Sequence, residues 1–225
     1  QFKKVREFEK KFSQWNGSKF SVLVNSGSSA NLLMVQCCKE LYNWKNNDEI
    51  IVPSVTWPTT ITPVIQSGLK PVFVDVNLKD FSFDYKNLQK KISKKTKAIF
   101  VAHLIGFHAD IDRIKKIIGK RKIILIEDCC ESQGAKINGK KVGNFGISGS
   151  FSFYWGHHMS TIEGGMICTN NKKFYDLCLL KRSHGLAREL LPKDQIYYKK
   201  KYNKNNFKFL FLTDGFNLRS TEINA

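Results

Sequence analysis

The sequence lacks several features that would place it in familiar classes of protein. No apolar run approaches the roughly 18–20 residues that span a bilayer, so we predict no membrane association. The opening stretch QFKKVREFEKKF is charged throughout, which predicts no secretory leader. The six cysteines show no CxxC spacing, and sequence neighbours such as Cys37 and Cys38 rarely form a disulfide or chelate one metal together. We therefore expect reduced, buried thiols in a cytoplasmic protein without a metal site.

Acidic residues and arginines are also scarce. The 37 basic residues outnumber 19 acidic ones, which gives a net charge of +18, yet 31 of them are Lys and only 6 are Arg. The forked guanidinium of Arg, rather than the point charge of Lys, suits recognition of phosphates and base edges. The lysines are scattered in pairs such as Lys94-Lys95. This pattern indicates a solvated, Lys-rich surface, and we expect no nucleic-acid partner.

Apolar residues are plentiful enough for a sizeable core. They make up 42% of the chain and aromatic residues 12%, a composition that excludes disorder of the whole chain. A length of 225 residues fits one domain, or one large domain cut short. Because the chain opens on Gln1 and closes on GFNLRSTEINA without a stop signal for its last element, we expect residues 1–225 to be a piece of a longer protein.

Strand-like and helix-period stretches alternate along the chain. The patterns predict helices over residues 2–15, 30–44, 59–67, 85–92 and 111–118, and strands over residues 20–24, 49–55, 71–76, 98–105, 122–126, 150–154 and 165–169. Continuous apolar strands such as AIFVAHLI suit a sheet covered on both faces. The alternation therefore predicts a three-layer α/β domain with a mostly parallel sheet. The charged, Asn-rich stretch 190–210 is predicted to be a loop excursion.

Ligands of open α/β sheets bind beyond the carboxyl ends of the strands, and one turn there suits a phosphate. The stretch 25–30, NSGSSA, joins a predicted strand to a predicted helix and contains Gly27 and Ser28. Free amides at a helix N-terminus, surrounded by small residues and hydroxyls, form a phosphate cradle. An ordinary N-cap explains the same residues equally well, since Ser is a preferred capping residue.

Two further clusters carry groups that can do chemistry. Glu127 and Asp128 directly follow the apolar run KIILI, with Glu131 just beyond, and a carboxylate at that strand end either points into the ligand crevice or caps a turn. The strand over residues 150–154 runs into a turn that carries His157 and His158. Histidine shuttles protons near neutral pH, although a pair of histidines in a loop is also compatible with a structural role.

Taken together, the order of these motifs resembles one family. The phosphate turn, VTWP, EDCCES, SFSFYWGHH…EGG and GFNLRS follow one another as in the DegT-type sugar aminotransferases, which have the aspartate aminotransferase fold. The resemblance covers nearly the whole chain. It implies the large domain of fold type I, with the small C-terminal domain missing, and pyridoxal or pyridoxamine 5'-phosphate as cofactor. It also implies a homodimer with shared active sites.

The resemblance assigns roles to individual residues of this sequence. Gly27 and Ser28 would hold the cofactor phosphate, with Ser152 adding a hydroxyl. Trp57 would stack on the pyridine ring, and Asp128 would pair with the ring nitrogen and keep it protonated.

Four more positions follow from the same resemblance. Glu131 stands where family members place a residue near the ring hydroxyl. Asn217 and Arg219 match a segment that reaches the neighbouring subunit's site, where Asn217 would contact the cofactor and Arg219 the substrate. His184 is expected to face the substrate as well.

One departure from the family pattern decides the expected reaction. His157 stands where most members carry the lysine that binds the cofactor covalently, and imidazole moves protons but cannot form that bond. A subgroup with His at this position is similar to glutamate-using 3-dehydratases of nucleotide-linked 4-keto-6-deoxyhexoses, in which His157 would be the base. None of the six cysteines has the C-x-C spacing of the members that hold an iron–sulfur cluster. The stretch GHHMSTIEGG resembles the cluster-free members that act on GDP-4-keto-6-deoxymannose, and this resemblance implies deoxysugar biosynthesis for surface polysaccharide. A nucleotide-sugar aminotransferase and an inactive binding member remain as alternatives.

Overall fold

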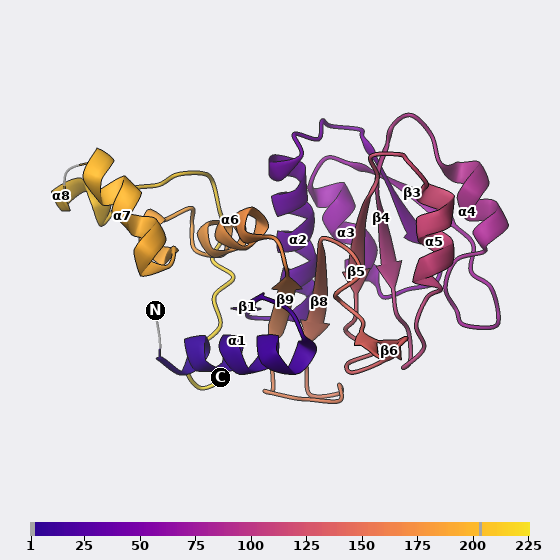
Figure 1. Ribbon diagram of the computed structural model, residues 1–225, viewed down its shortest axis with the longest axis horizontal. Coiled ribbons are helices and arrows are strands. Elements are labelled where there is room, and N and C mark those ends of the chain that lie inside the picture. The colour runs from indigo at the N-terminus through magenta and orange to yellow at the C-terminus, as the bar shows by residue number, and fades with distance from the viewer. Residues whose placement is uncertain (1–2, 203) are drawn as a thin grey trace.

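The computed structural model describes residues 3–202 and 204–225 and is built on one central sheet (Figure 1). Its strand order is β1-β9-β8-β5-β4-β2-β3, and β9 runs antiparallel to both of its neighbours while the remaining pairs are parallel. The strands are β1 (Phe20–Val24), β2 (Glu49–Pro53), β3 (Lys70–Val74), β4 (Thr96–Ala102), β5 (Ile124–Asp128), β8 (Ser148–Ser152) and β9 (Gly165–Thr169). The mostly parallel sheet predicted from the apolar runs is confirmed.

Helices cover both faces of this sheet. On β2, the buried side chains of Ile50 and Val52 join one core cluster, and the intervening Ile51 joins another on the opposite face. The first face is covered by α2 (Gly27–Leu41), α3 (Pro58–Gln66) and α6 (Lys172–Arg182), and the second by α1 (Lys3–Asn16), α4 (Tyr85–Lys91) and α5 (Ile111–Ile118). No helix in the described part of the chain is long and apolar enough to cross a membrane.

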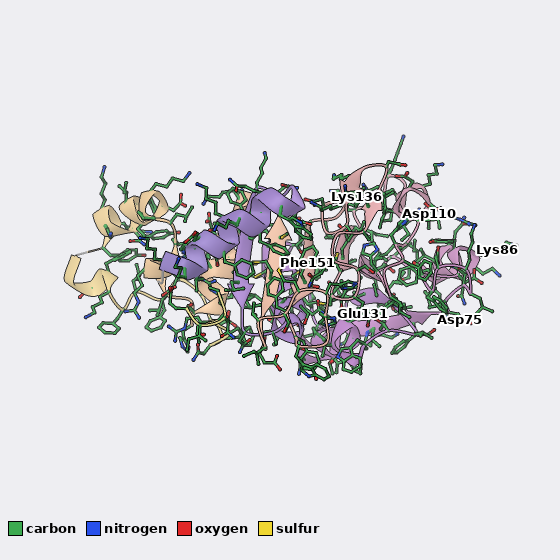
Figure 2. The ribbon with its side chains drawn as sticks, turned by 90° about the horizontal axis from the view of Figure 1, so that it is seen from below. Asp75, Lys86, Asp110, Glu131, Lys136 and Phe151 are labelled. Carbon is green, nitrogen blue, oxygen red and sulfur yellow. The ribbon has the colours of Figure 1, made fainter. Side chains whose placement is uncertain are left out.

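Aromatic side chains fix α1 against the sheet. The ring of Phe12 meets that of Phe151 edge-on at a centroid distance of 5.2 Å, and Phe153 lies 5.4 Å from the same ring. Figure 2 shows Phe151 beside this helix. The predicted helix over residues 2–15 is therefore found as α1, with Phe2 outside the described residues. A small hairpin of β6 (Lys136–Ile137) and β7 (Lys140–Lys141) precedes β8.

The prediction of a loop over residues 190–210 is wrong, because the chain forms helices there. After a 3₁₀ turn over Ala187–Glu189, the chain forms α7 (Pro192–Lys201) and α8 (Lys204–Phe207), with Asn203 outside the described residues. Proline in the first helical turn favours this start, because its fixed φ suits a helix and its missing N–H is not needed there. None of the residues of α7 is buried, and Figure 1 shows the segment projecting from one end of the body, so it remains an excursion.

All six cysteines are free thiols, as expected, and five of them are buried. Burial raises the pKa of Cys37, Cys38 and Cys129 well above the ordinary value and that of Cys168 to about 11. Thiols with such pKa values are protonated at neutral pH, so they behave as small apolar side chains of the core.

Candidate active site

A cavity of about 600 Å³ opens at the edge of the sheet where the parallel strands end. Its lining comes from the turn after β1, the loop after β2, the ends of β4, β5 and β8, and the turn before β9. The residues selected from the sequence that line it are Gly27, Ser28, Trp57, Asp128, Glu131, Ser152 and His157. Segments far apart in the sequence thus bring these seven side chains or backbone groups to one place.

The turn after β1 has the geometry of a phosphate cradle. Ser26 caps α2, and its Oγ accepts the backbone N–H of Ser29 at 3.0 Å. The first N–H groups of a helix have no acceptor inside the helix, so those of Gly27 and Ser28 are available to an anion. A Cβ added to Gly27 would lie 2.5 Å from Cβ of Ser152 and 2.9 Å from its Oγ. Only glycine therefore lets the Ser152 hydroxyl approach this turn.

Gly165, the first residue of β9, packs against the same turn, and it was not selected from the sequence. A Cβ at this position would lie 2.2 Å from the carbonyl oxygen of Ser26 and 2.7 Å from the backbone nitrogen of Gly27. The first residue of β9 must therefore lack a side chain for the turn to rest on the strand. The Gly164-Gly165 pair in the sequence was the signal that could have shown it.

Asp128 is a buried carboxylate held in place by neutral donors. Its Oδ2 accepts Nδ2–H of Asn31 at 2.7 Å and Oγ1–H of Thr60 at 2.8 Å. Its Oδ1 accepts the N–H of Cys130 at 3.1 Å and faces Oγ of Ser150 at 3.5 Å. Asn31 and Thr60 were missed in the sequence, because their function depends on α2 and α3 converging on the end of β5. The carboxylate has no cationic partner among these contacts, so it is free to pair with a positively charged group of a ligand.

An aromatic ring and a second carboxylate flank the cavity. Trp57 is 64% exposed, so its indole face is available to a planar ligand. Glu131 is half-buried, and its Oε2 accepts the N–H of Ile105 at 3.3 Å. Both residues line the cavity together with Asp128, and their expected contacts with the cofactor stay predictions.

His157 stands in the exposed turn between β8 and β9 and faces the cavity. Its backbone N–H donates to the carbonyl oxygen of Tyr154 at 3.0 Å, and the two rings meet edge-on at 6.1 Å. Burial of the ring lowers the pKa of His157, with a contribution from His158, while Glu131 and Asp128 oppose the shift. The imidazole is therefore mostly unprotonated at neutral pH, which is the state that a general base requires.

Three of the residues selected from the sequence do not line the cavity of this chain. His184 is exposed at φ 61°, and its N–H donates to the carbonyl oxygen of Phe216. Asn217 accepts Nε–H of Arg219 at 3.0 Å on the surface. Their segment runs beside the end of β1, where the carbonyl oxygen of Leu218 accepts the N–H of Asn25. Their expected roles toward a second subunit stay predictions.

The cavity as a whole fits a phosphorylated, planar, cationic ring. The cradle at Gly27, which a Cβ would fill, suits the phosphate, Trp57 suits the ring face, and Asp128 suits a protonated ring nitrogen. Pyridoxal phosphate has these three features. No lysine stands among the residues that line the cavity in the described ranges.

Comparisons with known proteins agree with this geometry. A profile of the DegT/DnrJ/EryC1/StrS aminotransferase family matches residues 1–225. The chain is 40% identical over 223 residues to GDP-4-keto-6-deoxy-D-mannose 3-dehydratase of Yersinia pseudotuberculosis, covering 98% of this chain and 57% of that protein. It is 35% identical over 183 residues to GDP-perosamine synthase of Escherichia coli O157:H7, covering 81% of this chain and 49% of that protein. The chain thus spans about half the length of these relatives.

Solved structures show the same fold. GDP-4-keto-6-deoxy-D-mannose-3-dehydratase of E. coli with bound hydrated pyridoxal phosphate superimposes with a TM-score of 0.94 at 40% identity, covering 100% of this chain and 58% of that one. A mutant of GDP-4-keto-6-deoxymannose-3-dehydratase with bound GDP-perosamine gives 0.93 at 40% identity, covering 99% and 58%. The predicted three-layer fold, with the large-domain architecture of fold type I, is confirmed.

Proposed function

The chain belongs to the DegT/DnrJ/EryC1/StrS aminotransferase family, and on this premise we propose that the whole protein is a pyridoxal-phosphate-dependent GDP-4-keto-6-deoxymannose 3-dehydratase. One observation carries this choice within the family. His157 lines the cavity, and no lysine does so in the described part of the chain. Without a lysine amine to hold the cofactor between turnovers, ordinary amino transfer lacks its usual resting state, whereas a base that only moves a proton is still present.

The residues of the cavity divide the work of binding the cofactor. The amides of Gly27 and Ser28 and the hydroxyl of Ser152 hold its phosphate, and Trp57 covers one ring face. Asp128, oriented by its neutral donors, accepts the N–H of the ring nitrogen. When bound, the cofactor supplies an electron sink for the bond changes at the sugar.

His157 performs the proton transfer in this proposal. Its neutral imidazole would take up a proton at the carbon that bears the cofactor's amine and would pass it to the 3-hydroxyl of the sugar, which would leave as water. The reaction consumes one glutamate per sugar: the amine of glutamate is released as ammonia, its carbon skeleton becomes 2-oxoglutarate, and the sugar gains the two electrons. The product is a GDP-linked 4-keto-3,6-dideoxyhexose.

The test measures the product of the full-length protein. The protein is incubated with pyridoxal phosphate, glutamate and GDP-4-keto-6-deoxymannose, and the sugar nucleotide is analysed by mass spectrometry while ammonia is assayed. Loss of the 3-hydroxyl with one ammonia released per sugar supports the dehydratase. A product with the mass of an amino sugar would instead establish the aminotransferase alternative, and no reaction despite cofactor binding would support the inactive binding member.

Two histidine variants assign the base. His157→Ala is expected to lower kcat at least 100-fold, the usual range for losing a general base. His158→Ala is the matched control, because His158 is the exposed neighbour in the same turn and does not line the cavity. Activity of the His157→Ala protein equal to that of the control would remove His157 from the mechanism.

We also propose that two copies of the chain share their sites. Trp57 in the cavity lining is 64% exposed, and Ile105 and Trp155, which are sequence neighbours of lining residues, are each 70% exposed, so a second copy would cover apolar surface here. In such a cytoplasmic homodimer, Asn217 and Arg219 reach the partner's cavity, and a smaller C-terminal domain completes the enzyme. Mixing inactive His157→Ala and Arg219→Ala proteins tests this arrangement, since mixed dimers regain one intact site. Absence of recovered activity would contradict it.

A further inference from the structure

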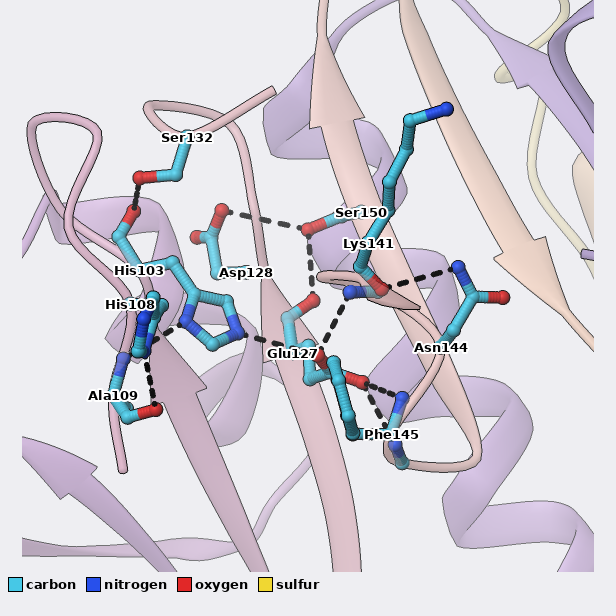
Figure 3. A network of polar contacts seen from close by, with 12 residues as sticks. His103, His108, Ala109, Glu127, Asp128, Ser132, Lys141, Asn144, Phe145 and Ser150 are labelled. Carbon is cyan, nitrogen blue, oxygen red and sulfur yellow. Dashed lines mark hydrogen bonds and ion pairs between the residues drawn. The ribbon is translucent and has the colours of Figure 1, made fainter. Parts of the chain in front are cut away.

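The buried carboxylate of Glu127, next to Asp128, has four close polar contacts. Glu127 is inaccessible to solvent, and its Oε1 accepts the N–H groups of Phe145 and Gly146, both at 2.7 Å. Its Oε2 accepts the N–H of Gly143 at 2.7 Å and lies 3.2 Å from Nε2 of His103 (Figure 3). Burial alone would raise the pKa of Glu127, but the hydrogen bonds from His103 and these amides outweigh it and lower the pKa. Glu127 is therefore ionised.

His103, the partner of Glu127, is held in one ring tautomer. Nδ1 of His103 accepts the N–H of Ala109 at 3.2 Å, so the ring proton resides on Nε2 and is donated to Glu127. Cys129 places its Sγ within 4.8 Å of the two other side chains' ligand atoms, a grouping that resembles a metal site. Because N–H groups already occupy Nδ1 of His103 and both oxygens of Glu127, the group is a hydrogen-bond network.

This network joins the end of β5 to the loop after β4 and to the turn before β8. Figure 3 shows Glu127 between His103, which follows β4, and the turn that precedes β8. The backbone N–H of His103 also donates to the carbonyl oxygen of Asp128 at 2.9 Å, and His103 contributes to the cavity wall. Successive residues of a strand point to opposite faces. Anchoring Glu127 on its own side therefore fixes the rotation of the end of β5 and, with it, the direction of the Asp128 carboxylate.

We propose that the His103–Glu127 pair is a positioning unit that aims Asp128 at the ring nitrogen of the cofactor, an inference that rests on the proposed function. The pair does not touch the reacting atoms in this scheme. It acts through Asp128, so its removal weakens the contact with the ring nitrogen while the phosphate cradle, on α2 and β8, stays intact.

The substitution Glu127→Gln removes the negative charge of the side chain and keeps its size and shape. Gln keeps one oxygen for Phe145 and Gly146, but it turns an NH₂ toward the N–H of Gly143 and Nε2–H of His103, so donor faces donor. The matched control is Glu49→Gln. Glu49 is a buried carboxylate at the start of β2, at the opposite edge of the sheet, and it accepts Oγ–H of Ser93.

Calorimetric titration of the full-length protein with pyridoxamine phosphate, and separately with inorganic phosphate, gives the readout. Glu127→Gln is expected to weaken pyridoxamine phosphate about tenfold, roughly the worth of one charge-assisted hydrogen bond, and to leave inorganic phosphate unchanged. Glu49→Gln should leave both unchanged. The double variant with Asp128→Asn should bind no more weakly than Asp128→Asn alone, because both changes remove the same contact. Additive losses, or a Glu127→Gln protein that binds like the native one, would overturn the pair's role.

Two further results distinguish failure of this inference from misfolding of a variant and from failure of the proposed function. If Glu127→Gln fails to fold by circular dichroism, His103→Gln and His103→Ala replace it. Gln offers an N–H to Glu127 and should bind pyridoxamine phosphate more tightly than Ala does, and equal affinities would overturn the inference. A native protein that does not bind pyridoxamine phosphate would overturn the proposed function and, with it, the role of the His103–Glu127 pair. Normal binding by the native protein together with unaffected binding by the variants would overturn only the role of the pair.

Discussion

Adding one methyl group at Gly165 tests what sets the position of the phosphate turn. In Gly165→Ala the new Cβ would lie 2.2 Å from the carbonyl oxygen and 2.3 Å from the carbonyl carbon of Ser26, and 2.7 Å from the nitrogen of Gly27. These are backbone atoms, so no side-chain rotation relieves the overlap. The turn must withdraw from β9 by about 1 Å to reach ordinary van der Waals contact.

The size of the effect follows from that displacement. Overpacking of this kind costs about 1–3 kcal/mol of stability. A shift of about 1 Å also lengthens amide-to-phosphate distances from about 2.9 Å to beyond hydrogen-bond range. Losing two charge-assisted hydrogen bonds, from Gly27 and Ser28, at about 1.5 kcal/mol each weakens phosphate binding by about 3 kcal/mol, or roughly 100-fold.

Two measurements on the full-length protein separate stability from binding. Urea denaturation gives the loss of stability, and calorimetric titration with pyridoxamine phosphate gives the dissociation constant. Gly139→Ala is the control, because Gly139 has φ +80° and no atom within 4 Å of a new Cβ. It should lose about 1–2 kcal/mol through backbone strain and bind the cofactor normally. Native-like affinity in Gly165→Ala would refute the argument that β9 supports the turn.

Three other predictions concern the core and the site. Arg182→Met removes one of two guanidinium groups that donate to the buried carboxylate of Glu9, at 2.8 Å, while that of Arg6 still donates at 2.9 Å, so unfolding in urea should show a loss of about 1.5–3 kcal/mol, and no measurable loss would contradict this. Thr60→Val removes a donor from Asp128 and should weaken pyridoxamine phosphate about tenfold in calorimetry without changing inorganic phosphate. Because burial lowers the pKa of His157 below 6.5, kcat/KM should fall on the acid side with a midpoint below pH 6.5. A midpoint above that value would mean that another group limits the rate.

The placement of the site was predictable from the sequence because strand ends converge. Asp128 and Ser152 end a strand, Gly27 and His157 follow one, and in a mostly parallel sheet such positions meet at one edge. The choice between Glu127 and Asp128 as the cavity residue came from the family resemblance, since either register of the strand was compatible with the apolar run. The structure resolves it by sending the two side chains to opposite faces.

The segments that the sequence did not reveal lack a periodic apolar face. In α6 the buried side chains include Tyr175, Leu180 and Lys181, which project from different sides of the helix rather than along one stripe. Lys181 and Arg182 are buried there because each has an acidic partner. α7 has no buried side chain at all, so no pattern marked it as a helix. Asn31 was missed for a related reason: it is polar, buried inside α2, and intelligible only once Asp128 lies beside it.

The electrostatics of the cavity argue for a site that one chain does not complete. The protein carries a net charge of +18, yet the cavity lining in the described residues contains Asp128, Glu131 and Glu163 and neither lysine nor arginine. In this chain the phosphate of the cofactor would rely on the N-terminus of α2 and on hydroxyl groups, and the diphosphate of a nucleotide sugar would meet no cation. Cationic groups must therefore come from outside this lining. Arg219, half-buried beside the end of β1, is suited to supply one to a second copy, which gives the proposed shared site a physical reason independent of the exposed apolar side chains.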